Sequence, residues 1–297
     1  MDWNLARSFP LIKHGDLDFP TYIPVVAEIG INHNGDLQTA KELIALAART
    51  GCDAVKFQKR TVEIVYPRDV LDAPRESPWG TTQRDQKNGL EFGETEYAEI
   101  DEFCRESGIE WSASAWDLPS LEFIESFNPP FHKIASALIT HSDLVTEVAR
   151  LNRPTLISTG MATLEMIDEV VAVFRAIGTP FALLHTVSTY PTPEKDVNLA
   201  LIHTLRRRYQ VPVGYSGHEP SVSPSIIAAA LGAQVIERHI TLDRTMYGSD
   251  QAASLEESGL RQLIATVRKM PGLIGNGVKG WASGESDVAA KLRYWES

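Results

Sequence analysis

The stretch VVAEIG at residues 25–30, together with DAVKFQ at 53–58, decides the fold. Both runs are short and apolar, which is typical of buried strands. The segment between them, 37–50, has apolar residues at helical spacing, and Gly51 follows it as a helix stop. A strand, a helix and a second strand in this order are the sequence signal of a parallel sheet with helical crossovers.

The same unit recurs along the whole chain. The six further apolar runs of strand length are IEWSAS (109–114), FHKIAS (131–136), PTLIST (154–159), PFALLH (180–185), VPVGYS (211–216) and QVIERH (234–239). Helical patterns lie near 37–50, 95–107, 118–127, 141–151, 163–177, 196–208, 221–231 and 255–269. Eight strands alternating with eight helices predict an α/β fold, an eight-stranded parallel β/α (TIM) barrel. The alternative, an open doubly wound sheet, would leave two edges and typically has fewer strands.

No linker or shift of composition divides the chain, so residues 1–297 are predicted to form a single catalytic barrel domain. Residues 1–20 would be an N-terminal extension. The long insert 59–94 follows the second strand and is rich in charge, proline and glycine. Barrels place lids and substrate-binding loops at this position, whereas a disordered excursion is the alternative for this segment.

The charge and the two cysteines narrow the functional class. The formal net charge is −11, and the one dense basic run, 206–208, lies near a predicted helix end, so a nucleic-acid binder is not expected. No stretch reaches about 18 apolar residues, and the N-terminus lacks the features of a secretion signal. Cys52 and Cys104 lie in different elements without metal spacing, which favours structural thiols in a cytoplasmic protein over a redox or zinc role.

Polar residues interrupt the strands at or just after their carboxyl ends, where a buried barrel strand should be nearly continuous Val, Ile and Leu. In chain order they are Glu28, Lys56, Gln58, Ser114, Lys133, Ser136, Ser158, Thr159, Ser188, Tyr190, Ser216, His218, Glu237 and His239. In a barrel these ends converge on one face, where catalysis takes place. A hydrogen-bonded core group could account for any one of them, but hardly for the same end of eight strands.

The residue types indicate the chemistry of this face. Lys56 and Lys133, with serines beside them, make a site for phosphate or carboxylate. Two unpaired ammonium groups would be costly in a barrel mouth, so a bound dianion is their natural partner. His218 and His239 follow adjacent strands with Glu237 close by, which suits a divalent transition metal that leaves positions open for water and substrate. A purely structural histidine pair is the alternative.

Several motifs together resemble the sialic acid synthase family, whose members condense phosphoenolpyruvate with N-acetylmannosamine or a related sugar. They are AEIGINHNGD (27–36), KFQK (56–59), STGM (158–161), YPTP (190–193), GYSGHE (214–219) and ERHITLD (237–243). The resemblance covers about residues 20–285. The runs WGTTQRDQKNGLEF (79–92) and GSDQAASLE (248–256) look closer to the animal-type synthases than to many bacterial ones.

The resemblance implies roles for individual residues. Glu28, Lys56, Lys133, His218 and His239 would be catalytic, with Glu28 facing the reacting carbons. Phosphoenolpyruvate would be held by Lys56, Ser114, Lys133, Ser136, Ser158 and Ser216, and the sugar by Gln58, Tyr190 and Asp250, with Ser188 and Glu237 also at the substrate site. His218 and His239 would bind Mn²⁺ or Mg²⁺. The expected product is a nonulosonic, sialic-acid-like 3-deoxy-2-keto acid plus phosphate, made by a cytoplasmic homo-oligomer.

Departures from the family pattern concern the sugar side. An acidic residue usual after the fourth strand is replaced by the run Leu138-Ile139-Thr140-His141, and an Asn common after the sixth strand is Ser188. The chain ends at KLRYWES (291–297), where an antifreeze-like C-terminal domain would begin. The expected acceptor is therefore a sugar other than free N-acetylmannosamine, unless a partner completes the pocket.

Two other functional classes stay open at this point. A metal-dependent aldolase or sugar isomerase would also place histidines and lysines at strand ends, but would not need two lysines and a row of serines for two anionic groups. A non-catalytic barrel serving in binding or assembly would be expected to lose His218, His239 or Lys133, and all three are present.

Overall fold

A computed structural model of the chain describes residues 11–14 and 17–296. Eight parallel strands form one sheet, in the order β7, β4, β3, β12, β11, β10, β9, β8. Their bounds are β3 Val25–Gly30, β4 Ala54–Lys59, β7 Glu110–Ala115, β8 His132–Ile134, β9 Thr155–Ser158, β10 Phe181–Thr186, β11 Val213–Gly217 and β12 Ile236–His239. The end strands β7 and β8 lie in contact, and the Ser112 hydroxyl donates to the Phe131 carbonyl at 2.6 Å. The sheet is a nearly closed barrel, which confirms the predicted TIM-barrel fold.

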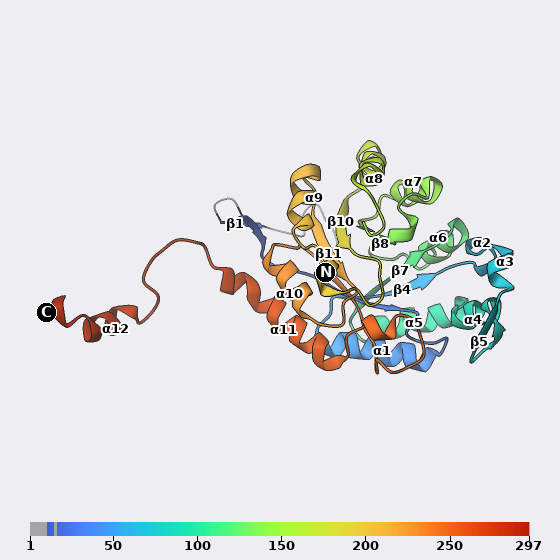
Figure 1. The fold of residues 1–297 in the computed structure, drawn as a ribbon, viewed down its shortest axis with the longest axis horizontal. Helices are drawn as coiled ribbons and strands as arrows, with labels where there is room; N and C mark the ends of the chain where they lie inside the picture. The colour runs from blue at the N-terminus through green and yellow to red at the C-terminus, as the bar shows by residue number, and fades with distance from the viewer. Residues whose placement is uncertain (1–10, 15–16, 297) are drawn as a thin grey trace.

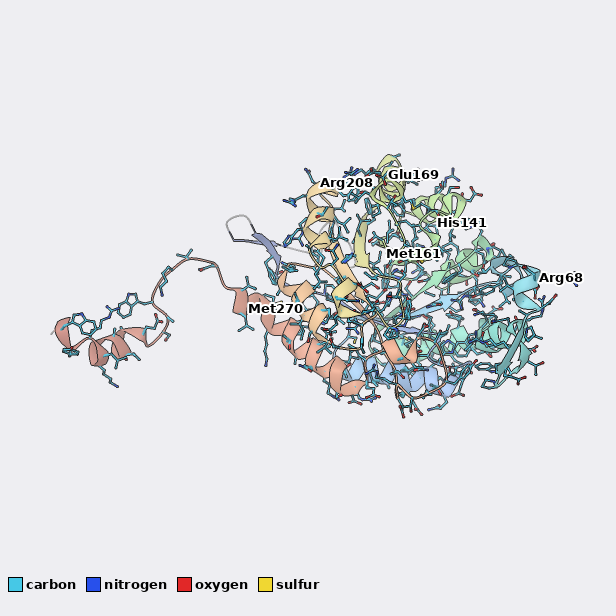
Figure 2. All side chains as sticks on the ribbon, in the orientation of Figure 1. Arg68, His141, Met161, Glu169, Arg208 and Met270 are labelled. Atoms are coloured by element: carbon cyan, nitrogen blue, oxygen red, sulfur yellow. The ribbon has the colours of Figure 1, made fainter. Side chains whose placement is uncertain are left out.

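Helices surround the strands on the outside (Figure 1). They are α1 Leu37–Thr50, α5 Glu94–Glu106, α6 Leu118–Glu125, α7 Ser142–Arg150, α8 Leu164–Ile177, α9 Leu201–Tyr209, α10 Ser223–Ala230 and α11 Glu257–Ile274. The expected start of a helix at 196 is wrong, because 194–196 form a 3₁₀ turn and Asn198 has a left-handed φ of 49° that a helix does not accept. Arg208 lies at the exposed end of α9 and pairs with Asp168, as a solvated helix end would (Figure 2).

The interior of the barrel is closed by a small apolar layer, separate from the larger core between strands and helices. Its fully buried members are Val26, Ala54, Phe131, Leu156, Ala182, Leu184 and Val235. Since side chains alternate between the two faces of a strand, the residue two positions further on points to the same interior face, one level nearer the mouth. The residues at that level are Glu28, Lys56, Lys133, Ser158, Thr186 and Glu237. The apolar layer is therefore the floor beneath a polar layer.

The insert 59–94 is folded, so the alternative of a disordered excursion is wrong. It contains α2 Val62–Val65, α3 Arg68–Leu71, the hairpin of β5 Pro74–Ser77 with β6 Gly80–Thr82, and α4 Gln83–Leu90. Trp79 packs on Gly89, where an added Cβ would lie 2.1 Å from the indole, and its ring lies 5.8 Å from that of Tyr247. The insert thus packs against the segment that follows β12. Arg68 marks its outer edge in Figure 2.

The two ends of the described chain add smaller elements. β1 Leu11–His14 and β2 Leu17–Pro20 pair as an antiparallel hairpin, while 1–10 and 15–16 of the predicted extension lie outside the described residues. After α11 the chain continues to α12 Glu285–Leu292 and a 3₁₀ turn, Tyr294–Glu296, which stand away from the barrel (Figure 1). Among the described residues no helix is both long and apolar enough to cross a membrane. Cys52 and Cys104 are buried and free.

A fully buried ion pair ties β11 to β12 on their outer side. Arg238 Nη1 lies 3.0 Å from Glu219 Oε1, and neither side chain is exposed to solvent. Glu219 also accepts from the Tyr215 hydroxyl at 2.8 Å, and Arg238 donates to the Ser221 carbonyl at 2.9 Å. The charges are therefore compensated inside the protein. In the sequence, Glu219 directly follows His218 and Arg238 directly precedes His239, so the ion pair adjoins both candidate metal-binding histidines.

We predict that Glu219→Ala lowers the free energy of unfolding by about 3–5 kcal/mol, because it leaves the Arg238 charge buried without its partner. The matched control is Glu257→Ala, which removes an exposed partner of Arg49 and Arg261 and should cost about 0–1 kcal/mol. Urea denaturation of both variants measures the difference. Equal effects would contradict the assignment of a compensated buried charge.

Candidate active site

The polar layer lines a cavity of about 170 Å³ at the carboxyl ends of the strands. The cavity brings together all the predicted site residues except Asp250. They are Glu28, Lys56, Gln58, Ser114, Lys133, Ser136, Ser158, Ser188, Tyr190, Ser216, His218, Glu237 and His239. Asp250 lies just beside them, with Oδ2 at 3.8 Å from Nδ1 of His239. Strand register alone brings several members side by side, since Glu28 pairs with Lys56 and with His239, and Ser216 pairs with Glu237.

Lys56 is held by two carboxylates. Its ammonium forms an ion pair with Glu28, lies 3.9 Å from Glu237 and donates to the Ser114 hydroxyl at 3.1 Å. Burial by itself lowers the pKa of Lys56, but Glu237 and Glu28 outweigh it and leave this pKa above its ordinary value. Lys56 is therefore positively charged at neutral pH.

Lys133 is the less compensated of the two lysines. Its ammonium donates to the Ser158 hydroxyl at 2.7 Å and to the Ile134 carbonyl at 3.0 Å, and its one carboxylate neighbour in the ion pairs, Glu237, is 3.9 Å away. Burial lowers the pKa of Lys133 to about 8. The sequence indicated a bound dianion as the natural partner of the two lysines, and the structure adds two carboxylates of the chain itself, Glu28 and Glu237, so that the formal charges of the four residues sum to zero.

The serines complete the polar layer as hydrogen-bonding groups. The Ser216 hydroxyl donates to Glu237 at 2.9 Å, and the Ser136 hydroxyl accepts from the Gly160 N–H at 3.1 Å. Ser136 lies in a 3₁₀ turn, Ser136–Leu138, not in the strand where it was expected, because β8 ends at Ile134. An added Cβ on Gly160 would lie 2.2 Å from the Ser188 hydroxyl, so only glycine lets the backbone approach both serines.

His218 and His239 lie next to each other in the cavity wall, with ring centroids 5.5 Å apart and ring planes inclined at 55°. Burial, then the neighbouring His239, lowers the pKa of His218 to about 3, so its ring is neutral. Nδ1 of His218 lies 2.6 Å from the Val187 carbonyl, which can only accept, so this nitrogen carries the proton. Nε2 then has a free lone pair and accepts from the Tyr190 hydroxyl at 2.9 Å.

This arrangement fits a divalent cation bound by two protein ligands. The lone pair of His218 Nε2 is available in place of the Tyr190 contact, and Nδ1 of His239 is buried without a hydrogen-bond partner in the described part of the chain. Among the described residues, no three or more His, Cys, Asp or Glu side chains are grouped so that they could hold a metal ion by themselves. Water and substrate would have to supply the remaining ligands.

Sequence reasoning missed part of the cavity wall. Trp116, Ala135, Ala137, Met161 and Thr186 also line it. Thr186 could have been found, because it lies two residues beyond the interior Leu184. Met161 has a left-handed φ of 58° and is 66% exposed at the rim; it is the last residue of the STGM motif, but its apolar side chain did not mark it as a site residue.

A barrel that gathers two buried ammonium groups, two carboxylates and two imidazoles at the carboxyl ends of its strands belongs to the barrel enzymes, whose active sites lie on this face. The comparison with protein families is more specific. Residues 43–279 match the model described as the NeuB family, and the chain belongs to that family.

Relatives of the chain are named as synthases of sialic acids and related sugars. The human N-acetylneuraminate-9-phosphate synthase is 38% identical, over 86% of this chain and 72% of that protein. The N,N′-diacetyllegionaminic acid synthase of Legionella pneumophila is 34% identical, over 91% of this chain and 78% of that protein. A solved structure of N-acetylneuraminic acid synthetase from Leptospira borgpetersenii, in complex with citrate, superimposes with a TM-score of 0.82 at 30% identity, covering 96% of this chain and 98% of that one. The resemblance to sialic acid synthases is confirmed, and the chain is an enzyme of this class.

We predict that Lys133 loses its proton near pH 8, about two pH units below an ordinary lysine, because its ammonium is buried. Nuclear magnetic resonance of protein labelled with ¹³C at the lysine ε-carbons measures this directly. One signal should titrate near pH 8, and it should be missing in Lys133→Arg. If every lysine signal titrates near pH 10.5, the described environment of Lys133 is wrong.

Proposed function

We propose that the chain joins phosphoenolpyruvate to the aldehyde of an open-chain sugar, giving a nonulosonic 3-deoxy-2-keto acid and phosphate. The observation that carries the proposal is the pair of buried ammonium groups of Lys56 and Lys133. Each of them donates a hydrogen bond to a serine hydroxyl, and both line one cavity with His218 and His239. A substrate with both a phosphate and a carboxylate matches this pair. Membership of a family whose named members make sialic-type acids supports the same reaction.

Charge balance supports a divalent cation in the same site. Lys56, Lys133, Glu28 and Glu237 sum to zero, so phosphoenolpyruvate adds net negative charge to a buried cavity, where this is costly. The imidazoles of His218 and His239 line the same cavity as the two lysines, and burial keeps the imidazole of His218 neutral by lowering its pKa. A divalent cation such as Mn²⁺ or Mg²⁺ held there would offset the added charge and polarise the acceptor aldehyde.

The chain's own groups would act as follows. Lys56 and Lys133 hold the phosphate and carboxylate while the enol carbon of phosphoenolpyruvate bonds to the aldehyde carbon. Water then adds to C2, and the bond between C2 and the phosphate oxygen breaks. Of the two water protons, one ends on the new hydroxyl and one on phosphate. Glu28, paired with Lys56 and hydrogen-bonded to Gln58, is the carboxylate placed to accept a proton from that water.

The acceptor side differs from the phosphoenolpyruvate side. Leu138 is buried in the core, and its neighbour Ala137 lines the cavity, so this turn offers a sugar no carboxylate. Losing such a hydrogen bond to a charged group costs about 1.5–3 kcal/mol of binding. An acceptor other than free N-acetylmannosamine, or a partner subunit that completes the pocket, is therefore part of the proposal. The cytoplasmic location, the single-domain division and the homo-oligomer stay predictions.

The deciding experiment mixes the protein with phosphoenolpyruvate, Mn²⁺ and a panel of aldoses. We expect phosphate release that depends on the aldose, because the enol carbon attacks only in the presence of an acceptor. Lys133→Ala should raise the Michaelis constant for phosphoenolpyruvate far more than that for the sugar. Cleavage or isomerisation of a sugar without phosphoenolpyruvate would instead favour an aldolase or isomerase, and no turnover with any aldose would favour a binding protein.

We predict that His218→Ala and His239→Ala each lower the bound divalent metal and abolish turnover, because each removes one of two protein ligands. Metal per chain is measured by mass spectrometry after dialysis against Mn²⁺. His203→Ala on α9, outside the cavity, is the control and should keep full metal. A double variant of His218 and His239 that retains metal and activity would overturn the assignment.

A further inference from the structure

The two candidate metal ligands lie on neighbouring strands whose backbone pairing stops just short of them. The last pair of β11 with β12 is Gly217 with Arg238. His218 and His239 come directly after these two residues. In the described part of the chain, the ladder of the sheet therefore does not fix one imidazole against the other. Groups that act together in a site must be held to within about 0.5 Å, so another interaction has to set their separation.

The other backbone contacts of the two histidines go to different loops. The His218 carbonyl accepts from the Thr192 N–H at 3.0 Å, and its ring Nδ1 lies 2.6 Å from the Val187 carbonyl. The His239 carbonyl accepts from the Leu255 N–H at 2.8 Å. These bonds hold each histidine to its own surroundings and leave the distance between the two histidines open.

The guanidinium of Arg238 spans the gap that the ladder leaves. Because His239 lines the cavity and side chains alternate along a strand, Arg238 points to the outer side of the barrel, where it is fully buried. There its Nη1 donates to the Ser221 carbonyl at 2.9 Å, and its Nη2 donates to the Glu219 carbonyl. The residue before His239 thus binds the backbone that follows His218.

The Glu219 carboxylate keeps the guanidinium in this position. Its Oε1 lies 3.0 Å from Nη1 of Arg238, and its Oε2 accepts from the Tyr215 hydroxyl at 2.8 Å. The same Nη1 also donates to the Ser225 hydroxyl at 2.9 Å. A Cβ added to Gly217 would lie 2.7 Å from both carboxylate oxygens, so the carboxylate is packed on the last residue of β11. The planar fork of an arginine suits these several acceptors at once.

Stability alone does not account for the place of this ion pair. A buried ion pair is weak evidence for stability, because the cost of desolvation offsets much of the attraction. The formal charges of Arg238 and Glu219 cancel, and neither residue lines the cavity. The pair therefore adds no net charge to the site and touches no substrate there. Its contacts instead join the two segments that carry His218 and His239.

We propose that Arg238 and Glu219 are positioning residues, which hold His218 and His239 at the separation at which both bind one divalent cation. The proposal rests on the function proposed above and says how this chain prepares the metal side of that site. Residues that orient metal ligands from behind typically change metal affinity by about 10–100-fold when they are replaced. Without the pair, the segment after His218 is free to shift, and the cation keeps one imidazole in place of two.

Arg238→Lys tests the proposal. The lysine keeps a positive charge beside Glu219, but one ammonium cannot bind the backbone after His218 as the guanidinium fork does. We expect the dissociation constant for Mn²⁺, measured without substrates by electron paramagnetic resonance, to rise about 10–100-fold. Pulsed measurements on the native chain should show nitrogen couplings from two imidazoles. In Arg238→Lys at saturating Mn²⁺, one of these couplings should weaken or disappear.

The matched control is Arg268→Lys on α11, at the opposite end of the strands from the cavity. Arg268 also joins a backbone carbonyl and a carboxylate, since it donates to Gly51 at 3.0 Å and pairs with Asp53 at 2.7 Å. Its replacement should leave both the Mn²⁺ affinity and the nitrogen couplings unchanged. An equal loss of affinity in this control would indicate general loosening of the barrel and overturn the proposal.

Gly217→Ala decides the question if Arg238→Lys does not fold. It retains every charge, but the added Cβ displaces the Glu219 carboxylate, so Mn²⁺ binding should weaken in the same way. Native affinity and native couplings in the folded variants, even with a lower Tm, would make the pair purely structural and overturn the proposal. A native chain that binds no Mn²⁺ would instead reject the metal site itself, and the positioning role with it.

Discussion

The mutual compensation of four buried charges is the constraint on which the site depends. Glu28 and Glu237 keep Lys56 charged above the apolar floor of the barrel, and Glu237 in turn is kept ionised. Although burial favours the protonated acid, Lys133 and Lys56 hold the pKa of Glu237 below its ordinary value. Removing any one of these groups would leave an uncompensated charge in a place from which water is largely excluded. The polar layer is therefore a cooperative unit and not a set of separate ligands.

The positions of these groups follow from the alternation of side chains along each strand. Leu156 and Ser158 are two residues apart, as are Val26 and Glu28, so each of these strands contributes one apolar and one polar side chain to successive levels of the same interior. This regularity made both the barrel and the catalytic face predictable from the sequence. The types of residue at the strand ends indicated the chemistry, because lysines, histidines and carboxylates are rarely buried in a barrel interior unless they have a functional role.

The features that could not be predicted from the sequence depend on contacts between segments that lie far apart in the chain. The pairing of Lys56 with Glu28 requires the register of β3 on β4, which an apolar pattern does not specify. The folded insert was missed because its elements are short and its stability comes from contacts such as Trp79 with Gly89 and Tyr247. The same holds for Arg60, whose neighbours Trp116 and Glu91 lie on other elements. The abundance of charged residues within 59–94 was visible in the sequence, but which of them form ion pairs was not.

The contact between the insert and the barrel has a consequence for how the protein responds to salt. An added Cβ on Gly35 would lie 1.9 Å from the Gly89 carbonyl, and Trp79 fills the space beside that backbone contact. The insert is thus held near the barrel by close backbone approach and by an aromatic side chain, neither of which is screened by dissolved ions. Charges at the surface of the insert are screened, over a distance of about 8 Å at physiological ionic strength. Rising salt would therefore weaken the ion pairs at the surface of the insert while the insert itself stays seated on the barrel.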